Sequence, residues 1–69
     1  MIDYENLTRS EVENLIAERI IGRNAERNRK ILYRRLIDGI LFEALAEEFD
    51  LSVTQVKNVV YQGLKRLFR

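Results

Sequence analysis

Residues 42–67 read FEALAEEFDLSVTQVKNVVYQGLKRL, and this stretch decides the fold. Apolar residues recur at helical spacing on both sides of a short break, so the pattern predicts one helix over Phe42–Phe49 and a second over Val53–Leu67. Ser52 is a typical helix N-cap and marks the start of the second helix. Only residues 50–52 separate the two helices, and a connection this short favours the angled packing of a helix-turn-helix.

Small and apolar residues in this stretch can hold two helices at a fixed angle. Ala46 has the size and position needed where the helices cross, and Gly63 would let a neighbouring helix approach closely. The apolar residues expected to complete the frame are Leu45, Phe49, Leu51, Val56, Val59, Val60, Leu64 and Leu67.

A first supporting helix is expected over residues 7–22. Thr8 and Glu11 have the spacing of a capping box, which marks the start of a helix. Apolar residues then follow at helical spacing, and Gly22 is placed to end the segment as a C-terminal cap.

A second supporting helix is expected over residues 24–38. Asn24 can cap its start, and Gly39 is placed to stop it. With the helix-turn-helix of residues 42–67, these segments predict an all-α fold. We expect residues 1–69 to form a single small domain of three to four helices with the helix-turn-helix at its C-terminal end.

The composition argues against several classes of protein. The chain has no cysteine and no histidine, which removes disulfides, zinc sites built on these ligands and imidazole bases. We therefore expect no catalytic activity, no metal site and no cofactor. The longest apolar runs are three residues, and the acidic N-terminus lacks the basic start of a signal peptide. We expect a cytoplasmic protein that does not contact membranes.

Charge alternates in blocks along the chain. The net charge is only +1, yet residues 23–38 hold six basic and two acidic residues, and residues 53–69 hold four basic residues and no acidic one. Residues 1–22 and 39–52 are acidic. This distribution predicts two basic surfaces on an acidic body, which can bind phosphate without general adhesion to other surfaces.

The C-terminal half, residues 36–69, carries several motifs in a fixed order. Gly39 and Phe42 precede a helix with the pattern Glu-x-x-Ala-Glu, and a turn ending in Ser-Val leads to a helix with Val-Lys and a basic end. This order resembles the fourth region of bacterial sigma factors. Asp50 stands where that family usually has a glycine in the turn, and Leu41 replaces a hydroxyl residue that often caps the first helix.

The resemblance implies a transcription regulator that binds double-stranded DNA in a sequence-specific manner, with residues 52–61 on or at the start of a recognition helix in the major groove. The residues expected to face the bases are Val53, Thr54, Lys57, Asn58 and Tyr61. Ser52 and Gln55 would lie near phosphate. The alternative for this face is an ordinary solvated helix surface, and Tyr61 would serve equally well in closing the core.

Two basic clusters are candidates for further phosphate contacts. The first cluster lines one face of the second supporting helix and consists of Arg23, Arg27, Lys30 and Arg34. The second cluster lies at the C-terminal end and consists of Lys65, Arg66 and Arg69. The first cluster has an alternative interpretation as a solvated face, in which Glu26 pairs with Lys30 and Asp38 with Arg34. The second cluster would also suit the negative end of a helix dipole.

The acidic residues before the turn allow three interpretations. They can form an ordinary solvent-exposed face of their helix, complement its positive N-terminal end through Glu43, or form a docking face for a basic partner. The acidic residues concerned are Glu43, Glu47, Glu48 and Asp50. The resemblance implies RNA polymerase as a partner, and a single module would bind DNA weakly, so a homodimer or a polymerase partner is expected.

The length of the chain leaves no room for the other regions of a sigma factor, so we expect a fragment or a stand-alone regulator of phage or bacterial origin. Two other functions remain open. One is a protein-interaction module that binds RNA polymerase or another regulator. The other is a phage DNA-packaging protein resembling the small subunit of terminase. Strong salt dependence with a preferred DNA sequence would favour the regulator, and DNA-independent capture of polymerase would favour the interaction module.

Overall fold

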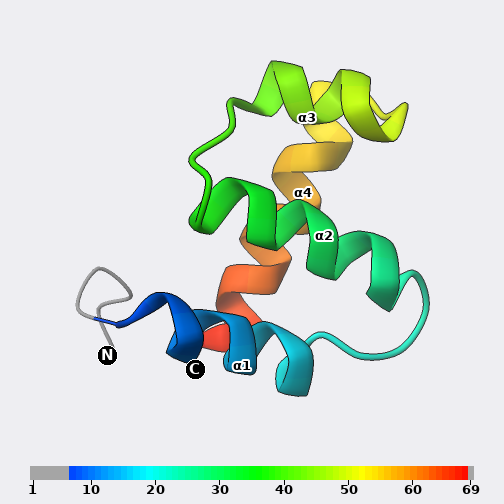
Figure 1. Ribbon diagram of the computed structural model, residues 1–69. Coiled ribbons are helices and arrows are strands. Elements are labelled where there is room, and N and C mark those ends of the chain that lie inside the picture. Colours follow the sequence, from blue (N-terminus) through cyan, green and yellow to red (C-terminus); the bar gives the residue numbers. More distant parts are fainter. Residues whose placement is uncertain (1–6, 69) are drawn as a thin grey trace.

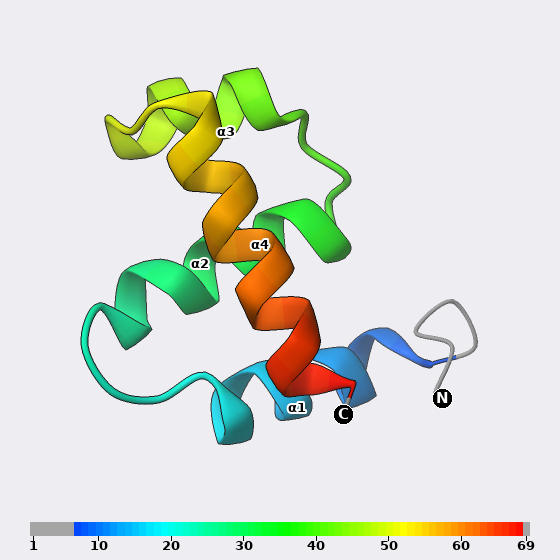
Figure 2. The same cartoon turned by 180° about the vertical axis from the view of Figure 1, so that it is seen from behind.

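The computed structural model describes residues 7–68, which form four helices and no strand. The helices are α1 (Arg9–Arg19), α2 (Ala25–Leu36), α3 (Phe42–Phe49) and α4 (Val53–Leu67). In Figure 1, α4 runs across the other three helices, and it packs against each of them. The view from behind places α4 in front of α2 (Figure 2). The predicted all-α fold is confirmed, and the bounds of α3 and α4 are those expected from the sequence.

The first helix begins at the predicted capping box. The Thr8 hydroxyl accepts a hydrogen bond from the Glu11 amide at 3.1 Å, and the Glu11 carboxylate accepts one from the Thr8 amide at 3.4 Å. The helix ends at Arg19, earlier than expected, because Ile20 adopts an extended backbone and is buried in the core. Gly22, predicted as the C-terminal cap, lies instead in the connecting loop with a φ of +93°.

The second helix is shorter than the predicted range, because it ends at Leu36. Asn24 occupies the N-cap position, but its side chain makes no capping hydrogen bond, so this part of the prediction is wrong. Its backbone is left-handed, with φ 61° and ψ 20°, whereas side-chain capping normally requires an extended residue. Gly39 is also left-handed, with φ +69°, and belongs to the loop that leads to α3.

Asp50 and Leu51 complete the C-terminal end of α3. Asp50 takes the left-handed conformation expected of this position, with φ 54° and ψ 48°. The Leu51 amide donates to the Ala46 carbonyl at 2.9 Å, and the Asp50 amide donates to the Glu47 carbonyl at 3.4 Å. This pair of hydrogen bonds is the Schellman motif, which ends a helix and sets the direction of the following chain.

The start of α4 is fixed by a second capping box. The Ser52 hydroxyl accepts a hydrogen bond from the Gln55 amide at 3.1 Å, and the Gln55 side-chain oxygen accepts one from the Ser52 amide at 2.9 Å. Both ends of the short turn between α3 and α4 therefore have specific hydrogen bonds, which restrict the angle between the two helices.

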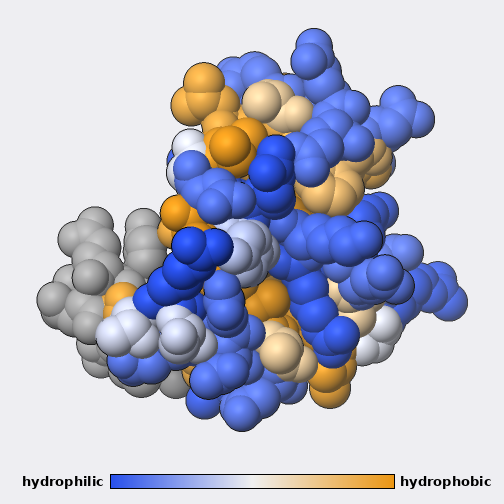
Figure 3. All heavy atoms as spheres, in the orientation of Figure 1, coloured by the Kyte–Doolittle hydropathy of each residue, from blue (hydrophilic) through white to orange (hydrophobic). Residues whose placement is uncertain are grey.

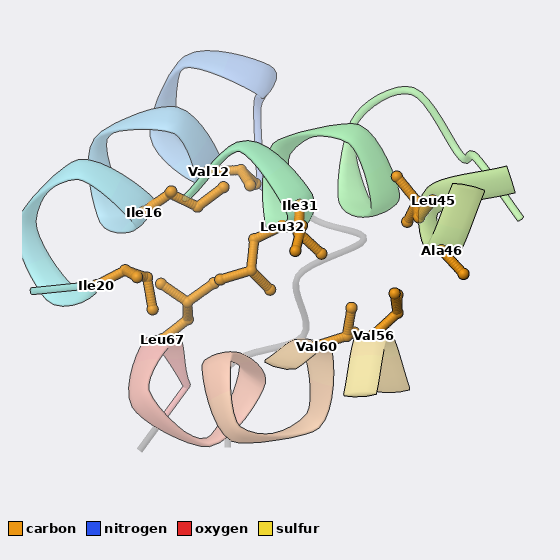
Figure 4. Close-up of a cluster of buried hydrophobic side chains, with 10 residues drawn as sticks. All are labelled: Val12, Ile16, Ile20, Ile31, Leu32, Leu45, Ala46, Val56, Val60 and Leu67. Atoms are coloured by element: carbon orange, nitrogen blue, oxygen red, sulfur yellow. The ribbon is translucent and has the colours of Figure 1, made fainter. Parts of the chain in front are cut away.

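The core lies where α4 crosses the other helices. Its buried apolar residues are Val12, Ile16, Ile20, Ile31, Leu32, Leu45, Ala46, Val56, Val60 and Leu67. Figure 4 shows Ala46 of α3 and Val56 of α4 at the same end of this cluster. Val60 is buried, whereas Val59 is only partly so. Within residues 7–68 no helix has both the length and the apolar character that crossing a membrane requires.

Gly63 allows α2 to approach α4 closely, as expected from the sequence. It is buried on α4, and a Cβ atom at this position would lie 2.5 Å from Cδ1 of Leu32. Leu32 itself has no exposed surface. The close contact between these helices therefore depends on glycine, which has no side chain, at position 63.

Candidate nucleic-acid interface

One long side of α4 is open to solvent. Thr54, Asn58, Tyr61 and Lys65 are exposed and follow one another at spacings of four, three and four residues, so they form one stripe along the helix. We call these four residues the α4 stripe. The stripe lies opposite the buried residues of the helix, and α4 contains no acidic residue. It brings together three of the five residues predicted to face the bases.

The other two predicted base-facing residues lie at the edge of α4 that faces α3. Val53 is half-buried and packs against the core, so it is less available for contact than the sequence suggested. Lys57 is exposed, and its Nζ lies 5.8 Å from the centre of the Phe42 ring. Lys57 therefore flanks the stripe and does not belong to it.

Tyr61 makes an aromatic contact while keeping half of its surface exposed. Its ring packs against that of Phe42 in a T-shaped arrangement, with centroids 6.2 Å apart and planes at 73°. The side chain is 50% exposed. The guanidinium of Arg35 also packs on Phe42, 4.1 Å from the ring centre, and donates to the Ile40 carbonyl at 3.0 Å. The residues around Tyr61 thus hold the α2–α3 loop against α4.

The two residues predicted to touch phosphate at the start of α4 already have structural partners. Ser52 and Gln55 form the reciprocal capping box, in which the Ser52 hydroxyl and the Gln55 side-chain oxygen each accept a hydrogen bond from the other residue's backbone amide. The sequence indicated the capping role of Ser52, but the part played by Gln55 was not predicted. The spacing of a hydroxyl residue and a glutamine three positions later was the available signal.

Two members of the first basic cluster pair with acidic residues. Arg34 donates to Oε1 of Glu48 through Nη2 at 2.7 Å and through Nε at 3.1 Å, and it also lies 3.7 Å from Asp38. Lys30 pairs with Glu26 at 3.6 Å. These contacts favour the alternative of an ion-paired face for this part of α2. Figure 3 shows that the side of the molecule over α2 is mainly hydrophilic, with small apolar areas between the helices.

The two remaining residues of the first cluster have different surroundings. Arg27 donates to Oδ1 of Asn28 through two nitrogens, both at 3.1 Å, and lies near Phe49 and the ion-paired face. Arg23 lies in the α1–α2 loop beside α4. Within residues 7–68 the Arg23 side chain has no hydrogen bond or ion pair, so its charge is available to a ligand.

A groove runs between the α1–α2 loop and α4, next to the α4 stripe. Its volume is about 400 Å³. Its polar lining residues are Arg23, Asn28, Asn58, Gln62 and Arg66. The apolar lining includes the buried Leu32, the half-buried Val59 and the exposed Ile21, and no acidic residue lines the groove. The sequence analysis did not predict that Asn28 and Gln62 line this groove. Gln62 follows Asn58 by one helical turn, and this spacing could have indicated that the two residues share a face.

The two described residues of the second basic cluster, Lys65 and Arg66, have different positions. Lys65 is exposed on the α4 stripe. Arg66 lines the groove and donates to the Ile21 carbonyl at 3.4 Å. Arg69 lies outside the described residues. Arg66 thus stabilises the α1–α2 loop and is also a candidate for binding phosphate.

Several arginines outside the predicted clusters hold the fold together. Arg19 donates to the Leu67 carbonyl at 3.0 Å and so provides a partner for one of the carbonyl groups at the C-terminal end of α4. Arg29 donates to the Ile20 carbonyl at 2.7 Å after the end of α1. On α1, the Arg9 guanidinium donates to the Tyr33 hydroxyl, and this hydrogen bond, together with the Glu13 carboxylate, raises the pKa of Arg9.

The acidic residues of α3 and of the turn that follows it have separate surroundings. Glu43 and Glu47 are exposed, Glu48 pairs with Arg34, and Asp50 forms the turn. Among residues 7–68, no three acidic side chains come together in a way that would hold a metal ion. Comparison of the chain with protein-family models, curated proteins and solved structures finds no match.

Proposed function

We propose that the chain is a transcription regulator that binds double-stranded DNA in a sequence-specific manner through a helix-turn-helix formed by α3 and α4. The observation that carries the proposal is the α4 stripe, a solvent-facing row of polar and basic side chains on a helix without acidic residues. The major groove of DNA is about 12 Å wide and admits one α-helix. A helix with this face outward and its other side anchored in the core meets that requirement.

The short connection between α3 and α4 supports the assignment. The Schellman motif at Asp50 and the capping box at Ser52 restrict the chain between the helices, and Ala46 provides the small residue where they meet. A recognition helix must keep its orientation while its side chains meet base edges. The hydrogen-bonded turn provides that rigidity in a chain of this size.

Each residue of the stripe has a chemistry suited to DNA. The Asn58 amide can bind adenine through two hydrogen bonds, and such a pair contributes about 1–3 kcal/mol of discrimination against the wrong base. The Thr54 methyl group can contact a thymine methyl group. Lys65, near the end of the helix, would contact phosphate, and Lys57 would contact a guanine or a phosphate from the flank.

A second candidate function has one observation in its favour. Leu41 is 66% exposed directly before Phe42, which contacts the half-exposed Tyr61. Exposed apolar side chains of this size are common at protein interfaces. A module that binds RNA polymerase or another regulator through this area, with little contact to DNA, is therefore the alternative.

Selection of binding sites from random-sequence duplex DNA tests the proposal. We expect the wild type to enrich a consensus sequence and Asn58→Ala to lose discrimination at one position, by roughly 5- to 150-fold. Asn14→Ala is the matched control, because Asn14 is exposed on α1, away from the stripe, and its loss should leave the consensus unchanged. A wild type that enriches no sequence would contradict the proposal, and direct binding to polymerase would then support the alternative.

A further inference from the structure

We propose that the groove between the α1–α2 loop and α4 holds the sugar-phosphate backbone of one DNA strand while the α4 stripe faces the bases. This inference rests on the proposed function and adds a specific role for the N-terminal half of the chain. We call the groove bounded by Arg23, Asn28, Asn58, Gln62 and Arg66 the backbone groove.

The charge of the backbone groove fits an anionic occupant. Arg23 enters from the α1–α2 loop and Arg66 from α4, and none of the residues that line the groove is acidic. A guanidinium group matches the geometry of phosphate through two parallel hydrogen bonds. Within the part of the chain that the structure describes, the Arg23 side chain has no partner. Arg66 uses only one long hydrogen bond, at 3.4 Å, to the Ile21 carbonyl, which leaves further donors for a ligand.

The polar and apolar lining residues also suit a nucleic-acid strand. Asn28 and Gln62 carry side-chain amides that can donate to phosphate oxygens. Val59 and the exposed Ile21 provide apolar surface for the carbon atoms of deoxyribose. A groove built for a free inorganic anion would need no such apolar surface.

The position of the backbone groove links it to base recognition. Asn58 belongs both to the groove lining and to the α4 stripe, so a strand held in the groove would present its bases next to the stripe. The groove lies on one side of α4 only; the other side carries Lys57 and the aromatic contact between Phe42 and Tyr61. The backbone groove would therefore set the direction in which α4 lies in the major groove.

Two arginine contacts keep the loop side of the groove in place. Arg29 donates to the Ile20 carbonyl at 2.7 Å, and Arg66 donates to the Ile21 carbonyl. These contacts hold the loop segment that precedes Arg23. Arg29 is thus a positioning residue for the groove and does not itself contact the ligand.

The salt dependence of binding to the selected duplex tests the inference. Each phosphate contact contributes about −0.9 to the slope of log K against log salt concentration. We expect Arg23→Gln to make the slope shallower by about 0.9 and to leave the preferred sequence unchanged. Lys30→Gln is the control for loss of one positive charge, because Lys30 is exposed on the ion-paired face of α2, and its slope should match the wild type.

Phosphate ethylation provides a second readout on the wild-type protein itself. We expect ethylation to interfere with binding at adjacent phosphates of one strand, and Arg23→Gln to become insensitive to one of them. An unchanged slope for Arg23→Gln, together with unchanged interference, would overturn the inference while leaving a sequence-specific wild type in support of the proposed function. A wild type that does not bind duplex DNA would overturn both.

Discussion

Replacing Gly63 with alanine tests how closely α2 and α4 pack. A Cβ atom at this position would lie 2.5 Å from Cδ1, 2.7 Å from Cδ2 and 3.1 Å from Cγ of Leu32. Leu32 is fully buried among other core residues and has little freedom to move away. The substitution therefore forces the two helices apart or pushes Leu32 out of its preferred conformation.

The expected effect of Gly63→Ala is the difference between two opposing contributions. Overpacking a well-packed core by one methyl group typically costs about 1–3 kcal/mol. Alanine in place of glycine within a helix contributes about 1 kcal/mol in the opposite direction. We expect a net loss of about 1 kcal/mol in the free energy of unfolding, which lowers the Tm of a domain of this size by roughly 4–8 °C.

Chemical denaturation of a double-mutant cycle separates the two contributions. In a Leu32→Ala background the space beside position 63 is open, so Gly63→Ala should become stabilising, by about 1 kcal/mol from helix propensity and renewed packing. The expected reversal of sign gives a coupling energy of about 2 kcal/mol between the two positions. If Gly63→Ala stabilises both backgrounds equally, then Leu32 of α2 does not pack tightly against position 63, and the inference that these two helices are in close contact is wrong.

Other substitutions test the ends of α3 and α4 and the contact between α2 and α3. Asp50→Gly should raise the free energy of unfolding by about 0.5–1 kcal/mol, because it relieves a left-handed residue and removes a negative charge from the C-terminal end of α3; a lower urea midpoint would contradict this. Ser52→Ala should cost about 1 kcal/mol through loss of the capping box, whereas Thr54→Ala, exposed two residues later, should stay within about 0.5 kcal/mol of the wild type in the same urea titration. Glu48→Gln should cost at most about 1 kcal/mol, since its pair with Arg34 is about 40% exposed, and this cost should fall toward zero near 1 M salt; a large loss at all salt concentrations would contradict a surface ion pair.

The C-terminal half of the fold was predictable because its signals are local. Asp50 marks the end of α3 and Ser52 marks the start of α4, and the spacing of apolar residues indicates the helices on either side. All of these signals act within a few residues of sequence. The close approach at Gly63 was also expected, although the partner Leu32 could not be identified, because the packing of one helix on another is a tertiary property.

The N-terminal helices were less well predicted at their ends. Gly22 and Gly39 do mark the loops, but α1 and α2 end earlier; in α1 this is because Ile20 leaves the helix to enter the core and Arg29 binds its carbonyl. The spacing of residues in the sequence does not show whether Ile20 continues the helix or leaves it to be buried in the core. An apolar residue two positions before a glycine is compatible with either outcome.

The basic residues were the least predictable part of the candidate site. Arginine side chains are long, and their partners can be far away in sequence: Arg34 pairs with Glu48, and Arg66 reaches the Ile21 carbonyl. A stripe on a helix shows which face a residue occupies but not which tertiary partner it meets. The association of Arg23 with α4 depends on the path of the α1–α2 loop, for which the sequence contained no local signal.

Mapping of chemical-shift changes by NMR, during titration with the selected duplex, tests most directly whether the open side of α4 binds DNA. We predict the largest changes at Thr54, Asn58 and Lys65 on the α4 stripe and at Arg23 beside it, with little change at Glu47 on the exposed part of α3. Changes confined to α3 and to the area around Leu41, with none on the α4 stripe, would contradict the proposal that α4 is the recognition helix.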